Sequence, residues 1–337
     1  MARADLLCDI IKFGLNNDSV NFRKAAEAIC AEERANQHCV LAKRIEEMLR
    51  MSSRTITREP SAPPARNGNG DNIVSEKIPE KKLDQLLLPK NIVETCKELF
   101  EEHMRADLLR SHGLEPRNKI LLIGPPGNGK TSLAEAIAEE LMLPILTVKY
   151  ESLVGAYLGE TASRLGKLFD YVKTRQCVLF FDEFETIGKE RGDTHETGEI
   201  KRVVSSLLLQ IDALPSYVIA IAATNHESLL DKAAWRRFQI KMELPIPSRA
   251  DLEIWFELFE RKNTNNDFSF GYSYSTLAKK LLGKSYAEVE EFALSIYRQF
   301  VLQLPNGIPK SITKKQLTLF SNINTDKESA IPEGGVE

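Results

Sequence analysis

Residues 119–141, "KILLIGPPGNGKTSLAEAIAEEL", decide the fold of this chain. An apolar run is followed by a glycine-rich loop, and a helical pattern opens at Thr131. From Gly124 to Thr131 the loop fits G-x-x-x-x-G-K-[ST]. Its glycines let backbone N–H groups curl around a phosphate, and the following helix N-terminus adds positive potential. The stretch therefore predicts a strand, a phosphate-binding loop and a helix in succession.

Apolar runs of the same kind recur further along the chain, with amphipathic segments between them. Each run reads as a strand buried on both faces, and the alternation predicts a parallel sheet covered by helices on both sides. The expected fold class is therefore α/β. The further strands are expected within residues 143–150, 177–183 and 217–225, and a shorter one within 239–247.

Polar residues follow two of these predicted strands, at the edge of the sheet where ligands bind. Asp182 is expected to hold Mg²⁺, and Glu183 to orient and polarise an attacking water. Lys130 would reach the β- and γ-phosphates of a nucleotide, and the Thr131 hydroxyl would bind Mg²⁺. Asn225 would hold the attacking water or sense the γ-phosphate, although an asparagine after a strand also serves as a turn or helix cap.

Composition shifts divide the chain into a helical N-terminal module, a Pro/Ser/Gly/Asn-rich linker, the α/β core, a small helical domain and a disordered tail. The N-terminal helices are too few for a large core and are expected to recruit a partner or assist assembly. The expected ranges are 1–50, 51–80, 81–247, 248–322 and 323–337.

Bulk properties exclude several classes of protein. The net charge of −3 argues against a nucleic-acid polycation, so no nucleic-acid partner is expected. The five cysteines are scattered and form no CxxC pair, which favours reduced thiols in a cytoplasmic protein over a metal site. The N-terminus carries charges within its apolar stretch, unlike a signal peptide, and no apolar run is long enough to span a membrane.

With these motifs together, residues 84–305 resemble the AAA family of ATPases, within the wider AAA+ group. The resemblance rests on the phosphate loop, on "FFDE" ending at Glu183, and on "ATNHESLLDKAAWRRF" ending at Phe238. It implies a P-loop parallel sheet followed by a helical lid domain, with ATP and Mg²⁺ as ligands. The nucleotide-binding residues it implies are Gly124, Pro125, Pro126, Gly127, Asn128, Gly129, Lys130, Thr131, Ser132, Gly283 and Ala287.

Two details refine that resemblance. Asn128 stands where the family usually has threonine, at a position that offers mainly its backbone. The stretch "GKSYAEVEEF", residues 283–292, resembles the lid segment near the adenine and ribose, in which Gly283 and Ala287 would allow close approach. It lacks the lid arginine of other AAA+ branches, which favours the AAA branch proper.

Arg236 and Arg237 lie adjacent in "AAWRRF", residues 233–238, with no acidic residue within that stretch. By the resemblance they are arginine fingers that reach the nucleotide of the neighbouring subunit in a ring, most often a hexamer. Many members space the two arginines further apart, so the sequence leaves open which one meets the γ-phosphate. The alternative is a pair of surface arginines stacked on Trp235 and Phe238.

The segment "SLVGAYLGET", residues 152–161, is similar to the aromatic loop that faces the central pore in ring-forming members. Tyr157 and Leu158 would grip a client polypeptide there. Tyr157 packed in the core is the alternative. Residues 188–202 would form a second pore loop or an ordinary solvated loop.

Two functions compete on this basis. One is a motor that remodels or threads a protein client, recruited through residues 1–50; the other is a nucleotide-gated switch that regulates a partner without processive threading. A DNA-handling role is disfavoured by the charge. The layout resembles katanin- and spastin-like members, and also small bacterial AAA ATPases that accompany a subtilisin-like serine peptidase, in which case the peptidase would be the partner.

Overall fold

The computed structural model describes residues 6, 10–13, 19–36, 38–51, 73–149, 158–185, 197–226, 232–263, 268–304 and 308–328. The chain forms two compact units. One comprises residues 1–123 and 130–243, and the other comprises residues 124–129 and 244–337. Each unit has its own apolar core.

The first unit is built on a six-stranded sheet with the strand order β1-β3-β4-β5-β2-β6. Strands β2 to β6 pair in parallel, and β1 runs antiparallel to β3. The predicted α/β class is confirmed, and each strand expected from an apolar run is present. The strands are β1 (Val74–Lys77), β2 (Lys119–Ile123), β3 (Ile145–Val148), β4 (Cys177–Phe181), β5 (Val218–Thr224) and β6 (Ile240–Glu243).

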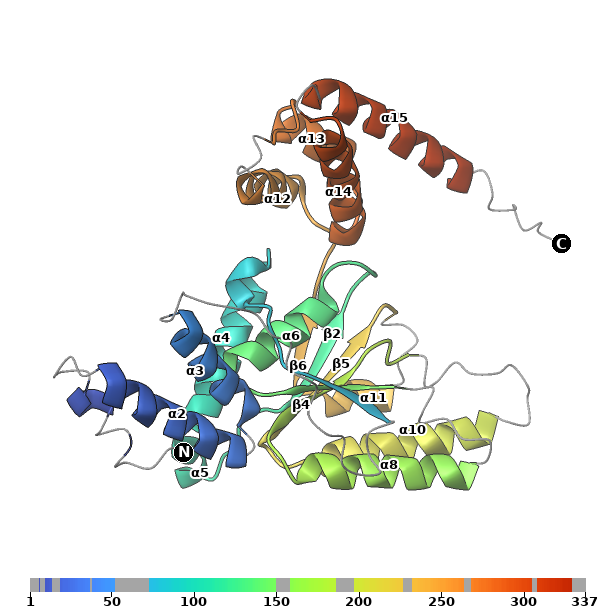
Figure 1. Ribbon diagram of the computed structural model, residues 1–337. Coiled ribbons are helices and arrows are strands. Elements are labelled where there is room, and N and C mark those ends of the chain that lie inside the picture. Colours follow the sequence, from blue (N-terminus) through green and yellow to red (C-terminus); the bar gives the residue numbers. More distant parts are fainter. Residues whose placement is uncertain are drawn as a thin grey trace. The chain divides into compact units, whose positions relative to one another are not determined.

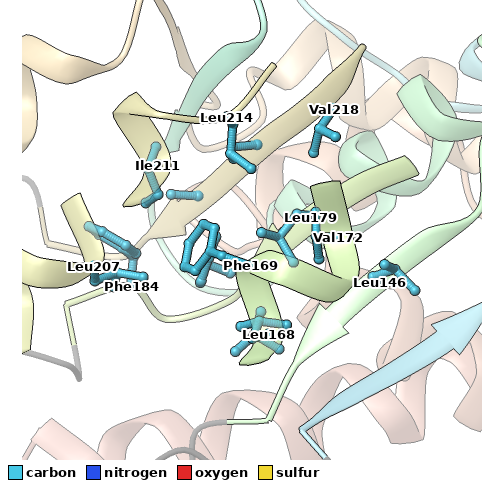
Figure 2. Close-up of a cluster of buried hydrophobic side chains, with 14 of the residues drawn as sticks. Leu146, Leu168, Phe169, Val172, Leu179, Phe184, Leu207, Ile211, Leu214 and Val218 are labelled. Atoms are coloured by element: carbon cyan, nitrogen blue, oxygen red, sulfur yellow. The ribbon is translucent and has the colours of Figure 1, made fainter. Parts of the chain in front are cut away.

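Helices cover both faces of this sheet (Figure 1), which is why its two central strands, β4 and β5, are buried at every position. Every residue of β4 is buried. Leu179 and Phe181 belong to the core cluster shared with α8 (Leu158–Lys173) and α10 (Thr197–Asp212), and the alternate residues Val178 and Phe180 face the opposite side. Figure 2 shows Phe169 of α8 among side chains from the sheet and from α10. The helices of this unit that follow β1 are α4 (Lys90–Met104), α5 (Ala106–Ser111), α6 (Lys130–Glu140), α8 (Leu158–Lys173), α10 (Thr197–Asp212) and α11 (Lys232–Arg237), with a 3₁₀ turn, η1 (Leu83–Gln85).

Strand β1 lies inside the range 51–80, for which a linker is expected. Its residues pair with β3, and the Lys149 N–H donates to the Ile73 carbonyl at 2.8 Å. Only Val74 of the strand is buried. An edge strand with one buried side chain has no apolar alternation to reveal it, so the sequence pattern missed it. Residues 73–80, of which 74–77 form β1, are therefore part of the folded first unit and not of a linker.

Two helices, α2 (Ser19–Ala35) and α3 (Cys39–Met51), form the N-terminal hairpin. They meet through buried small and aliphatic residues such as Ala26 and Val40. Arg44 of α3 forms an ion pair with Glu139 of α6 at 2.6 Å, and Glu139 is 6% exposed. The helical character expected for residues 1–50 is therefore present in their described part, which belongs to the same compact unit as the sheet.

The described part of the second unit is mainly helical from Arg249 on, in line with the helical domain expected from residue 248. Ser248 caps α12 (Arg249–Lys262) and Ser285 caps α14 (Tyr286–Leu302), each with its hydroxyl accepting from the backbone N–H three residues on. Its core is rich in aromatic contacts, including Phe256 against Phe270 with ring centroids 5.2 Å apart. The helices are α12 (Arg249–Lys262), α13 (Tyr274–Lys280), α14 (Tyr286–Leu302) and α15 (Pro309–Glu328), shown in orange to red in Figure 1.

Helix α15 extends past residue 322, where the tail was expected to begin. Within the described residues, no helix combines the length and the apolar character needed to cross a membrane.

Candidate functional site

Three neighbouring parallel strands, β4, β5 and β2, end at the same edge of the sheet. The segments that follow them carry Asp182, Asn225 and the phosphate loop with Lys130. Because the carboxyl ends of parallel strands share one edge, residues far apart in the sequence meet there. The sequence-predicted residues of the first unit are thus brought together by strand order.

Lys130, the first residue of α6, is 7% exposed. Its Nζ donates to Asn225 Oδ1 at 2.7 Å. Burial lowers the pKa of the Lys130 ammonium from its ordinary value, while the charges of Asp182, Glu185 and Glu183 oppose that shift. A buried cation facing carboxylates and an amide is suited to bind phosphate.

Thr131 and Asp182 are joined by a side-chain hydrogen bond. The Thr131 hydroxyl donates to Asp182 Oδ2 at 2.9 Å. A hydroxyl and a carboxylate are hard oxygen donors that suit Mg²⁺, which usually keeps several waters and substrate phosphates as its other ligands. Among the described residues no cluster of three or more His, Cys, Asp or Glu side chains could hold a metal ion by itself. These two residues therefore fit a partly hydrated Mg²⁺ bound together with a nucleotide.

Glu183 has an unusual backbone. Its φ of 49° lies in the left-handed region, which non-glycine residues rarely adopt. Its N–H donates to Asp182 Oδ1 at 3.0 Å, and its side chain is exposed. Strain of this kind costs about 1–3 kcal/mol and persists where surrounding contacts hold it. The turn thus presents the Glu183 carboxylate beyond the end of β4.

Glu185 is a site residue that the sequence reasoning missed. It is 6% exposed, and its Oε1 accepts from the Asn225 N–H at 3.1 Å. Burial is the largest influence on its pKa and raises it, but hydrogen bonds from its own N–H, the Thr224 hydroxyl and the Asn225 N–H together lower the pKa below its ordinary value. The available signal was a second acidic residue two positions after Glu183 in "DEFE".

The phosphate loop, residues 124–129, groups with the second unit. The Ala287 N–H donates to the Gly127 carbonyl at 3.0 Å, and a Cβ on Gly127 would lie 2.9 Å from the Ala287 Cβ. Gly127 also has a φ of 78°, so any side chain there would be both strained and crowded. Ala287 therefore lies against the phosphate loop. Its expected place near the adenine and ribose stays a prediction.

Other predicted nucleotide-binding residues have different surroundings. An added Cβ on Gly283 would meet no described protein atom within 4 Å, and the φ of 86° places this glycine in a left-handed turn. Its approach to the adenine and ribose stays a prediction. Asn128 is buried, and its Oδ1 accepts from the Tyr286 N–H at 3.4 Å while its Nδ2 has no partner among the described residues. Ser132 accepts a hydrogen bond from Lys81 Nζ at 2.7 Å.

Arg236 and Arg237 end α11 and differ from each other. Arg237 Nε forms an ion pair with Asp212 Oδ2, at the end of α10, with 3.2 Å between the atoms. Arg236 is exposed, and no ion pair or hydrogen bond joins it to another described residue. The aromatic face of Trp235 is taken by Lys241, whose Nζ lies 5.2 Å from a ring centroid of Trp235.

The arginine pair lies at the amino-terminal edge of its own sheet. Lys119, the first residue of β2, donates from Nζ to the Asp212 carbonyl at 3.3 Å and accepts from the Gln239 N–H at 3.0 Å. The phosphate loop begins at the other end of that strand, after Ile123. A five-residue strand rises about 13 Å over its length. The arginines and the nucleotide site of the same subunit therefore lie at opposite edges of the sheet.

Most of the two predicted pore loops lies outside the described residues. Tyr157 lies outside the described residues, as do residues 186–196 of the second expected loop. Leu158 begins α8. Both pore loops therefore stay predictions.

Residues 120–246 match the model of the "ATPase family associated with various cellular activities (AAA)". An "Uncharacterized AAA family ATPase y4kL" of Sinorhizobium fredii is 36% identical over 309 residues, which cover 90% of this chain and 91% of that protein.

More distant relatives share a smaller part. "Peroxisomal ATPase PEX6" of Neurospora crassa is 30% identical over 80% of this chain but only 19% of its own length. An archaeal "Cell division cycle protein 48 homolog" from Archaeoglobus fulgidus is 33% identical over 55% of this chain and 25% of its own length. The chain thus spans a quarter or less of these two relatives. Because the family match, the full-length relative and the phosphate-binding geometry agree, the chain belongs to the AAA family and is an ATPase.

Proposed function

We propose that this ATPase works as a ring of identical subunits, most simply a hexamer, and uses ATP hydrolysis to remodel or thread a protein client. The observation that carries the ring is the position of the arginine pair, at the sheet edge opposite its own phosphate loop. An arginine there is far from its own nucleotide but free to meet that of a neighbour. Rings arise when such head-to-tail contacts close on themselves.

Within one subunit, each site residue has a proposed part. Lys130 binds the β- and γ-phosphates while one of its three N–H groups still donates to Asn225, and the Asn225 amide faces the γ-phosphate or the attacking water. Glu183 orients and polarises that water. The Thr131 hydroxyl and the Asp182 carboxylate would hold Mg²⁺, which when bound neutralises charge on the phosphate oxygens. Phosphoryl transfer needs positioned charge more than covalent chemistry, and these residues supply it.

The neighbour contributes an arginine, and we assign that part to Arg236. Arg237 is engaged with Asp212 of its own subunit, whereas Arg236 is exposed at the end of α11. A guanidinium that stabilises charge on the transferring phosphoryl group is worth about 10³–10⁵ in rate. Hydrolysis in each subunit would then depend on ring assembly.

A protein client is favoured by the relatives. An "ATP-dependent zinc metalloprotease FtsH 2" from Phytoplasma mali is 36% identical over 56% of this chain and 28% of its own length. By its name that relative is a protease, and a protease acts on polypeptide. In this chain Tyr157 and Leu158 would contact the client in the pore, and residues 1–50 would recruit it. The alternative is a nucleotide-gated switch that regulates one partner, for example a serine peptidase, without threading.

Stimulation of ATP hydrolysis tests the proposal. An unfolded protein should raise the ATPase rate of the full chain, and DNA should leave it unchanged. A chain shortened to residues 73–337, which keeps β1, should retain basal ATPase and lose client processing. Stimulation by one folded partner alone, with no effect of unfolded protein, would favour the switch. Loss of assembly in the shortened chain would make the N-terminal helices an oligomerisation element.

A further inference from the structure

Glu185 is a buried carboxylate beside the nucleotide site with no part in the chemistry described so far. It is 6% exposed, and its Oε2 has no hydrogen-bond partner among the described residues. A carboxylate is tolerated in the interior only where hydrogen bonds or nearby positive charge compensate its lost hydration. The partners of Glu185, two positions after Glu183, therefore indicate what it holds in place.

Its contacts join the turn after β4 to the end of β5. Oε1 accepts the Asn225 N–H at 3.1 Å, and the hydroxyl of Thr224 donates to the same carboxylate. One residue earlier, the Phe184 N–H donates to the Ala223 carbonyl at 2.8 Å. The turn that carries Glu183 and the strand end that carries Asn225 are therefore held together by consecutive bonds.

The charge of Glu185 also reaches the phosphate-binding lysine. Its carboxylate acts on the Lys130 ammonium in the same sense as Asp182 and Glu183 do. Lys130 in turn donates to Asn225 Oδ1 at 2.7 Å. Because that oxygen is the acceptor for the lysine, the Asn225 amide N–H₂ is directed elsewhere and is available to donate.

We propose that Glu185 is a positioning residue for ATP hydrolysis: its carboxylate fixes the Asn225 backbone so that the amide meets the γ-phosphate or the attacking water, in register with Glu183. The inference rests on the proposed role of Asn225 but on nothing proposed about the client. Glu185 touches neither phosphate nor water and acts through Asn225. Its loss frees the strand end without removing any group that binds the nucleotide.

The test compares Glu185→Ala, Glu185→Gln, Asn225→Ala and the double variant Glu185→Ala/Asn225→Ala in the full chain. The measurements are kcat, KM for ATP, Kd for ADP and melting temperature. Glu185→Ala should lower kcat tenfold or more, about 1.4 kcal/mol of barrier, and change the Kd for ADP less than threefold. Glu185→Gln keeps an acceptor oxygen and the shape of the side chain, so it should fold as the parent does and recover part of the rate.

Non-additivity separates positioning from a general structural effect. The double variant should be no slower than Asn225→Ala alone, because Glu185 acts through Asn225. Glu139→Gln is the matched control, since Glu139 is as buried as Glu185 but pairs with Arg44 away from the site. It should leave kcat unchanged.

Two results would overturn the inference. One is a double variant slower than Asn225→Ala by the full Glu185 factor, and the other is normal kcat in both Glu185 variants beside a defective Asn225→Ala. Full activity of Asn225→Ala would instead remove the proposed role of Asn225 itself.

Discussion

Replacing Arg236 by alanine should abolish ATP turnover without weakening the fold. Arg236 is exposed and has no ion pair with a described residue, so its removal should change the free energy of unfolding by less than about 0.5 kcal/mol. Loss of a transition-state guanidinium should lower kcat by about 10³–10⁵, which corresponds to roughly 4–7 kcal/mol of barrier. The two effects thus differ by an order of magnitude in energy.

Asp212→Asn is the matched control for the arginine pair. It removes the partner of Arg237, and the side chains of Arg237 and Asp212 are 27% and 40% exposed. Ion pairs this accessible to solvent contribute about 0.2–1 kcal/mol. The melting temperature should fall by only a few degrees at most, and kcat should fall far less than in Arg236→Ala.

The decisive assay mixes two inactive variants. Lys130→Ala lacks a phosphate-binding lysine but keeps Arg236, whereas Arg236→Ala keeps the lysine and lacks the finger. In rings assembled at random from equal amounts, about a quarter of the interfaces pair an intact lysine with an intact neighbouring arginine. The mixture should therefore recover about a quarter of the parent rate if sites act independently.

Two results would contradict the assignment of Arg236 as the arginine that acts in trans. A mixture as inactive as its components, in rings shown by light scattering to be mixed, would refute action in trans. An active Arg236→Ala beside an inactive Arg237→Ala would show that Arg237 is the finger and that its contact with Asp212 breaks on assembly.

Three further predictions follow from particular residues. Glu183→Gln should still bind ATP, measured by equilibrium binding, because the phosphate-binding residues remain, but should not turn it over; normal turnover would exclude Glu183 from the mechanism. Burial raises the pKa values of the Cys96 and Cys177 thiols from 9.0 to about 12, so both should resist alkylation in the native protein at pH 8, and the free energy of unfolding should fall as pH rises from about 9 towards 12, since unfolded thiols ionise first; rapid labelling of either thiol without unfolding would contradict this. Tyr157→Ala should keep melting temperature and basal ATPase but lose client processing, whereas a core tyrosine would cost about 3–5 kcal/mol of stability on truncation.

The sequence alone determined those elements and motifs whose residues are adjacent in the chain. Strands β2, β4 and β5 were recognisable because side chains buried on both faces leave unbroken apolar runs. The phosphate loop was recognisable because its chemistry needs glycines, a lysine and a hydroxyl at set spacing. Asp182 and Asn225 directly follow two of those strands, so the pattern of the chain alone predicts much of the candidate site.

Tertiary structure decided what depends on neighbours distant in the chain. Glu185 meets Asn225 across 40 residues because β4 lies beside β5 in the sheet. Strand β1 exists because β3 offers it an edge, and its single buried side chain left no period to detect. The two arginines are indistinguishable in "WRRF", yet only Arg237 meets Asp212. A pattern reports how deeply a residue is buried, whereas its partner is set by the order in which strands and helices pack, which local sequence does not encode.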